Sequence, residues 1–133
     1  MYLRYLVIAA FVIHGLAHMS GFMAAWTSRD SGFTQNPWLF SRSSTLRSAM
    51  GKGFGLLWLV ASIALVGSGL GILLWPGLWP VLPVVASIIS LAVIIPWWNT
   101  VVPGAKVGAA YDVLALIALL PSWSQRVMAA LGL

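Results

Sequence analysis

The feature that most constrains this chain is a series of apolar stretches, each long enough to cross a lipid bilayer as a helix. A hydrocarbon core about 30 Å thick is crossed by roughly 20 apolar residues in helical form. Because a helix pairs its own backbone polar groups in lipid, the stretches are predicted to be transmembrane helices. There are four of them, at about residues 2–26, 49–75, 81–98 and 104–120.

The four predicted spans leave little chain for anything else. We therefore expect a single all-α transmembrane domain over residues 1–133, built as an integral membrane up-down four-helix bundle with short loops. One longer polar loop, residues 27–48, follows the first span. The tail, residues 121–133, has Trp123 on its apolar side and Arg126 on its polar side. It is expected either to lie in the membrane interface or to extend the last helix.

Composition and charge exclude several classes of protein. Hydrophobic residues make up 61% and charged residues 7% of the chain, whereas about 25% of a soluble domain is charged. The absence of cysteine excludes disulfides, thiolate metal sites and cysteine nucleophiles. The net charge of +5 comes from scattered basic residues without a basic stripe. The lipid bilayer, and not nucleic acid, is therefore the expected partner.

Positive charges are more frequent on the side of the membrane that carries the long loop. Cytoplasmic loops of membrane proteins carry an excess of Lys and Arg. The sequence therefore predicts a multi-pass protein of the cell membrane with this loop in the cytoplasm and both termini outside. The loop side has Arg29, Arg42, Arg47, Lys52 and Lys106, and the other side has Arg4 and Arg126.

Three ionisable side chains are predicted to lie inside the membrane. His14 and His18 are one helical turn apart and share a helix face, and Asp112 is the only acid within a span. A carboxylate at a helix centre costs about 2.5 to 3.5 kcal/mol, so Asp112 needs a partner or a proton. His18 and Asp112 each lie about eight residues, roughly 12 Å, from the loop-side end of their spans. We therefore expect these two residues to pair between the first and fourth helices.

Other polar residues are expected to complete this intramembrane cluster. His14 is predicted one turn deeper than His18, with Tyr111 close to it. Asn99 is predicted at the rim of the cluster, near the loop side. The polar interior is therefore expected to open toward the long loop.

Small residues four positions apart predict where helices approach closely. One such groove leads to Asp112 on the fourth span. On the second span we favour close packing within the chain, with an oligomer interface as the alternative. The glycine pairs are Gly51 with Gly55, Gly67 with Gly71, and Gly104 with Gly108.

The His and Asp cluster has three interpretations from sequence. Polar contacts between helices are common structural elements in membranes, so the residues can simply fix helix packing. His14, His18 and Asp112 also match the ligand set of a divalent metal centre with two imidazoles and one carboxylate. The same residues suit a proton or quinone site, because buried ionisable groups often mark proton relays. A haem held by both histidines is not expected, because its axial ligands approach opposite faces of the iron.

The segment IHGLAHMSGF, Ile13 to Phe22, resembles the first helix of small uncharacterised bacterial four-helix membrane proteins. The segment PWWNTVVPGAKVGAAYD adds a vaguer likeness. In size and number of helices the chain is also distantly similar to DoxX-like proteins, some of which are associated with quinone-linked redox complexes. The resemblance implies a redox-linked membrane subunit and supplies no catalytic residue.

Three functions follow as hypotheses. The first is an accessory subunit of a larger, bioenergetic membrane complex that packs against other membrane subunits or its own copies and helps to hold a cofactor, quinone or lipid. The second is a small intramembrane metal-binding or quinone-binding enzyme that uses His14, His18 and Asp112. The third is a proton-coupled carrier that works as an oligomer.

Overall fold

The computed structural model describes residues 2–28, 32–40, 44–100 and 103–133. This part of the chain is helical and contains no strand. Arg29 and Arg42, which contribute to the predicted orientation, lie outside the described residues. The helices are α1 (Tyr2–Trp26), α2 (Ala49–Leu74), α3 (Val81–Ile94) with the short 3-10 helix η1 (Ile95–Trp97), α4 (Gly104–Ala118) and α5 (Pro121–Leu131).

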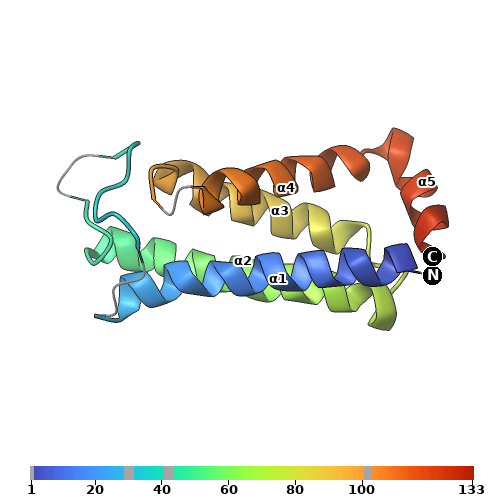
Figure 1. Ribbon diagram of the computed structural model, residues 1–133, viewed down its shortest axis with the longest axis horizontal. Coiled ribbons are helices and arrows are strands. Elements are labelled where there is room, and N and C mark those ends of the chain that lie inside the picture. Colours follow the sequence, from blue (N-terminus) through green and yellow to red (C-terminus); the bar gives the residue numbers. More distant parts are fainter. Residues whose placement is uncertain (1, 29–31, 41–43, 101–102) are drawn as a thin grey trace.

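The four longer helices run alternately in opposite directions (Figure 1). Close backbone contacts join α1 to α2, α2 to α3, and α3 to α4. The N and C termini lie at the same end of the bundle, because four antiparallel helices return the chain to its starting side (Figure 1). The long loop between α1 and α2 therefore lies at the opposite end, next to the start of α4.

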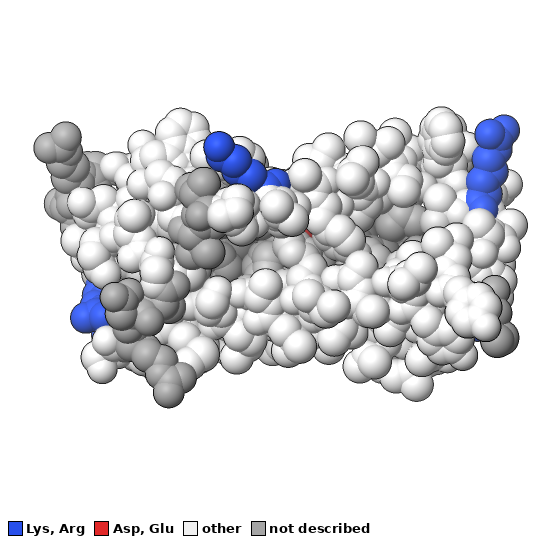
Figure 2. All heavy atoms as spheres, viewed as in Figure 1, with Lys and Arg blue, Asp and Glu red and all other residues white. Residues whose placement is uncertain are grey.

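The surface is suited to an apolar environment. Large exposed hydrophobic side chains occur on every α-helix, including Leu6, Ile63, Ile88 and Leu114. Figure 2 shows few charged side chains on the described part of the face that it draws. The outward faces of the helices therefore match lipid more closely than water.

Among the described residues, two helices, α1 and α2, are long and apolar enough to cross a membrane, and α4 with α5 would be a third only if the bent pair is one span. The apolar helix Val81–Trp97 is shorter. This finding supports a helical membrane protein and is coarser than the four spans predicted from sequence.

The tail does not extend α4, contrary to one of the two expectations from sequence. The axes of α4 and α5 differ by 97°. Pro121 begins α5, and the preceding residue, Leu120, has an extended ψ of 147°, as expected for a residue before proline. α5 folds across the end of the bundle that carries the termini (Figure 1), where Leu131 is buried.

Glycines on α1 and α2 bring these two helices into close contact. A Cβ atom at Gly21 would lie 2.3 Å from the ring of Trp58, and one at Gly15 would lie 2.9 Å from the carbonyl oxygen of Ser62. On α2, a Cβ at Gly55 would lie 2.7 Å from the Cβ of Ala25. A side chain at any of these positions would force the two helices apart.

The other glycines singled out on α2 have different roles. A Cβ at Gly71 would lie 2.7 Å from Leu82 of α3. Gly51 approaches the backbone of its own preceding loop, where a Cβ would lie 2.1 Å from the carbonyl oxygen of Leu46. At Gly67 a Cβ would meet no atom within 4 Å. The close packing expected at Gly67 therefore does not occur among the described residues, because this position turns away from the neighbouring helices.

The loop after α1 is held across the end of α3. The backbone N–H of Trp38 donates to the carbonyl of Pro96 at 3.2 Å, and its indole N–H donates to the carbonyl of Ile95. The carbonyl of Ile95 also accepts from the backbone N–H of Trp98 at 3.3 Å, so the loop adds a second donor at Ile95 and supplies a donor to Pro96 from outside the helix. The side-chain amide of Asn99 donates to the carbonyl of Asn36 at 3.0 Å. The loop therefore covers the end of the bundle where α4 begins.

We predict that Gly21→Ala lowers the free energy of unfolding by about 1 to 3 kcal/mol, because the added methyl group overlaps the Trp58 ring and the core has no room for it. The matched control is Gly67→Ala, where alanine meets no atom within 4 Å and favours the helix by up to about 1 kcal/mol. Denaturant unfolding in detergent micelles measures both values. Equal effects of the two changes would contradict the packing described for α1 and α2.

Candidate functional site

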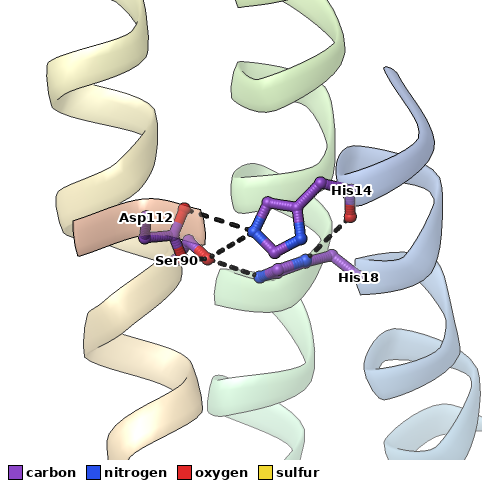
Figure 3. Close-up of polar contacts among 4 residues, drawn as sticks. All are labelled: His14, His18, Ser90 and Asp112. Atoms are coloured by element: carbon purple, nitrogen blue, oxygen red, sulfur yellow. Dashed lines mark hydrogen bonds and ion pairs between the residues drawn. The ribbon is translucent and has the colours of Figure 1, made fainter. Parts of the chain in front are cut away.

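Four polar side chains from three helices form one hydrogen-bonded cluster inside the bundle (Figure 3). His14 and His18 come from α1, Ser90 from α3 and Asp112 from α4. Asp112 and Ser90 are fully buried, and His18 is 6% exposed. Polar groups this deeply buried are expected to be paired, and the bonds between these residues provide that pairing.

His14 makes the direct contact with Asp112. Its Nε2 atom lies 3.2 Å from Oδ1 of Asp112. Gly108 makes room for this contact, because a Cβ at Gly108 would lie 2.9 Å from Cε1 of His14. The small residue predicted to open a groove beside Asp112 therefore admits the imidazole ring. Gly104 is exposed and lines the pocket described below.

The sequence led us to expect a direct pair between His18 and Asp112. The structure does not contain this pair. The Nδ1 atom of His18 lies 3.1 Å from the backbone carbonyl oxygen of His14, and its Nε2 atom lies 2.8 Å from the Oγ of Ser90. Ser90 in turn hydrogen-bonds to Oδ2 of Asp112. The predicted agreement in depth between the histidines and Asp112 holds to within one helical turn. The rotation of α1 about its axis then brings His14, and not His18, into direct contact with Asp112.

Ser90 is the residue that sequence reasoning missed. It belongs to an apolar helix, and a serine there normally satisfies its hydroxyl on its own backbone, as Ser68 does with the carbonyl of Ala64 at 2.8 Å. The available signal was the spacing of Ser87 and Ser90, which lie one turn apart and are both fully buried. Only the packing of α3 against α1 and α4 shows which of the two is bonded.

Aromatic contacts hold the His14 ring in place. The rings of His14 and Tyr111 have centroids 4.9 Å apart, and Phe11 packs edge-on against Tyr111 at 5.3 Å. The two imidazole rings also meet edge-on at 4.7 Å. Tyr111 therefore lies beside the cluster, as expected. Asn99 does not belong to it, because its side chain is exposed and bonds to the loop.

The side chains are not arranged as a metal centre. Among the described residues, no group of three His, Cys, Asp or Glu side chains is placed to hold a metal ion. The reason is visible in the bonding of His18, because Nδ1 faces a carbonyl oxygen and must carry a hydrogen, and Nε2 faces the Ser90 hydroxyl. The point toward which Nε2 of His14, Nε2 of His18 and Oδ2 of Asp112 converge is occupied by the Ser90 hydroxyl, which bonds to these groups in place of an ion. The divalent metal site predicted for these three residues is therefore not supported.

A cavity of about 120 Å³ lies beside the cluster, toward the loop-side end of the bundle. Its volume is below the roughly 300 Å³ at which sites for drug-sized ligands begin. The rings of Trp58 and Trp97 are 5.7 Å apart, and Phe33 meets Trp58 edge-on at 5.4 Å. The cavity is lined by both imidazoles and by aromatic and aliphatic side chains, among them His14, His18, Phe33, Trp58, Ile94 and Trp97.

One polar atom of a cavity-lining residue, Nδ1 of His14, and one fully buried donor, the indole N–H of Trp97, are not used by the described part of the chain. Nε2 of His14 is engaged with Asp112, which leaves Nδ1 without a partner among the described residues. The His14 side chain is 11% exposed. The indole N–H of Trp97 is buried and lacks an acceptor within the same part of the chain. The cavity therefore combines aromatic walls with an imidazole nitrogen that a bound molecule can satisfy.

Comparison with known proteins adds no family to this description. No protein-family model, curated protein or solved structure matches the chain.

We predict that Ser90→Ala lowers the free energy of unfolding by about 1 to 3 kcal/mol, because it leaves the buried His18 and Asp112 each without one hydrogen-bond partner. The control is Ser87→Ala on the same helix. Ser87 is as deeply buried, but its hydroxyl has no partner among the described residues, so its removal is expected to cause no loss. Unfolding in detergent measures both, and a Ser87→Ala loss as large as that of Ser90→Ala would contradict this assignment.

Proposed function

We propose that this chain is a small membrane subunit that binds the head group of a quinone-class molecule in the cavity beside His14. The main observation behind this proposal is the cavity itself, which places an imidazole with one free nitrogen among aromatic walls. A quinone head group is a planar ring with oxygen atoms on opposite sides, so it needs flat apolar surfaces and a few polar contacts.

The apolar walls support a single-ring ligand. Phe33 meets Trp58 edge-on, and Trp58 meets Trp97 at a tilted angle, so the wall that these rings provide to a planar guest is aromatic and apolar. Aromatic pairs of this kind contribute about 0.5 to 1.5 kcal/mol beyond the area that they bury. The small volume of the cavity favours one ring and places any isoprenoid tail outside it, along the apolar helix surface.

The polar contacts support a ligand that changes between carbonyl and hydroxyl forms. Asp112 accepts a hydrogen bond from Nε2–H of His14, which leaves the lone pair of Nδ1 as an acceptor. An acceptor at this position suits the O–H of a hydroxyl group on the reduced ring. In the other tautomer of His14, with the hydrogen on Nδ1, the same atom is a donor that suits a carbonyl oxygen of the oxidised ring.

We further propose that all four longer helices cross the membrane and that the chain works within a larger complex. The exposed apolar side chains on each helix fit lipid and membrane subunits alike. The excess of Lys and Arg on the loop side supports a cytoplasmic loop. Single cysteines introduced at Ser44 and Ser124 and labelled with a membrane-impermeant thiol reagent test this orientation, which labelling of Ser44→Cys from the outside would exclude.

Quinone binding is predicted to depend on the free volume of the cavity. Ala105 of α4 lines it, so Ala105→Phe is expected to fill the space and weaken binding by about tenfold or more, which corresponds to about 1.4 kcal/mol. Quenching of tryptophan fluorescence by decylubiquinone, with the protein in lipid nanodiscs, measures the dissociation constant.

The matched control is Ala110→Phe, on the exposed side of the same helix, where no change in the dissociation constant is expected. Equal quenching in the two variants and in the unchanged protein would show that the quinone acts from the lipid and not from the cavity. That result would refute the proposed site.

Association with partners is tested separately from ligand binding. Extraction with a mild detergent is expected to release the chain together with larger membrane proteins, because the exposed apolar side chains on its helices leave surface available to them. Size-exclusion chromatography and mass spectrometry identify the complex. Recovery of a single, monodisperse monomer would argue against the subunit role and would leave quinone binding untouched.

A further inference from the structure

The hydroxyl group of Ser90 lies between two groups that can each accept its single hydrogen. Its Oγ is 2.8 Å from Nε2 of His18 and also bonds to Oδ2 of Asp112. A serine hydroxyl donates one hydrogen bond and accepts up to two. It can therefore donate to only one of these neighbours and must accept from the other.

The orientation of His18 limits the possible arrangements. Its Nδ1 atom faces the carbonyl oxygen of His14 at 3.1 Å, and a carbonyl only accepts hydrogen bonds, so Nδ1 carries a hydrogen. When His18 is neutral, Nε2 then has a lone pair and accepts from Ser90. When His18 is an imidazolium, Nε2–H donates to Ser90.

Each form of His18 fixes the form of Asp112. If Ser90 donates to neutral His18, Oδ2 of Asp112 must be protonated and donate to Ser90. If Ser90 accepts from the His18 imidazolium, it donates to an ionised Asp112. Both arrangements satisfy every atom in the row and contain the same number of hydrogens. They differ only in which end of the row carries the proton.

We propose that Ser90 transfers a proton between Asp112 and His18. In one direction, the Oδ2–H bond of Asp112 breaks as a new Oγ–H bond forms on Ser90, and the original Oγ–H bond breaks as an Nε2–H bond forms on His18. The products are a carboxylate, an intact hydroxyl and an imidazolium. The step requires no other reactant, and it converts a neutral pair into an ion pair.

The groups next to Asp112, Ser90 and His18 do not change the number of protons that these three residues share. With its hydrogen on Nε2, His14 donates to Oδ1 of Asp112 at 3.2 Å in both arrangements, and the same nitrogen lies 3.5 Å from Oγ of Ser90. Tyr111 faces the His14 ring. α3 contains no titratable side chain, and the only one on α2 is Lys52, which lies over the ring of Trp26. The proton is therefore shared by one carboxyl and one imidazole.

The transfer links the carboxyl group to the cavity. Asp112 is fully buried and does not line the cavity, whereas His18 does. A proton that moves from Asp112 to His18 therefore comes to rest on a residue of the cavity wall, where both ring nitrogens remain hydrogen-bonded, Nδ1 to the carbonyl of His14 and Nε2 to Ser90. The inference depends on the hydrogen bonds of Ser90 and stands whether or not the cavity binds a quinone.

The chain is well suited to a direct test, because it contains only two aspartates, no glutamate and two histidines. Asp30→Asn leaves Asp112 as the only side-chain carboxyl. In this background, the protein is labelled with ¹³C-aspartate and ¹⁵N-histidine and studied by NMR in lipid nanodiscs without added ligand. The Asp112 carboxyl shift reports its protonated fraction, and the His18 nitrogen shifts, assigned by their loss in His18→Gln, report the imidazolium fraction.

At neutral pH the two fractions are expected to add up to one proton, because the row is complete only with one proton at one end. A sum of zero, with a carboxylate and a neutral imidazole, would overturn the proposal. A sum of two, with both groups protonated, would overturn it equally. This measurement on the unchanged row decides the proposal even if a Ser90 variant fails to fold.

Variants then test whether the hydroxyl group of Ser90 makes the link. Ser90→Ala is expected to separate the two titrations so that the sum departs from one, whereas Ser90→Thr, which keeps a hydroxyl, restores it. Ser87→Ala is the control on the same helix and is expected to match the unchanged protein. A Ser90→Ala spectrum identical to that of Ser87→Ala would show that Ser90 does not carry the proton.

Discussion

The arrangement of this bundle depends on one buried carboxyl group. Asp112 is completely removed from solvent, and a carboxyl group in such a place must be paired, hydrogen-bonded or protonated. Its two oxygen atoms are satisfied by different helices, Oδ1 by His14 of α1 and Oδ2 by Ser90 of α3. A shift of either helix would leave a buried polar group without a partner. The carboxyl therefore fixes the relative positions of α1, α3 and α4, in addition to any chemistry that it takes part in.

Glycine makes this arrangement possible by permitting close approach. Gly108 leaves room for the His14 ring beside α4, while Gly15 and Gly21 bring α1 against α2. Because helices in lipid associate through van der Waals packing and polar contacts, small residues and polar residues act together. Close packing places α1 at the correct depth, and the hydrogen bonds then fix its rotation. The aromatic cavity forms next to the cluster and is lined by residues at the loop-side end of the bundle, among them Phe33, Trp97 and Gly104.

The chemistry of the site follows from the way hydrogens are shared. His14 joins the carboxyl group to the cavity, because one of its nitrogens contacts Asp112 and the other has no partner in the described part of the chain. His18 also lines the cavity, but both of its nitrogens are engaged. The two imidazoles are thus similar in sequence and different in role. A metal ion would need a free nitrogen lone pair from each imidazole, which His18 does not offer, whereas proton chemistry can use hydrogen-bonded nitrogens.

The sequence by itself determined the helical architecture, the shared face of His14 and His18, and the similar depth of Asp112, because helical period and rise are local properties. It did not determine which histidine meets Asp112, since that depends on helix rotation, which is set by contacts with two other helices. The sequence also did not identify Ser90 as part of the cluster, because a serine in an apolar helix usually bonds to its own backbone. The sequence also did not distinguish Gly67 from the packed glycines. Its spacing matches theirs, but its position faces away from the neighbouring helices. Tertiary structure decided these points because each depends on which atoms from distant segments come within bonding distance.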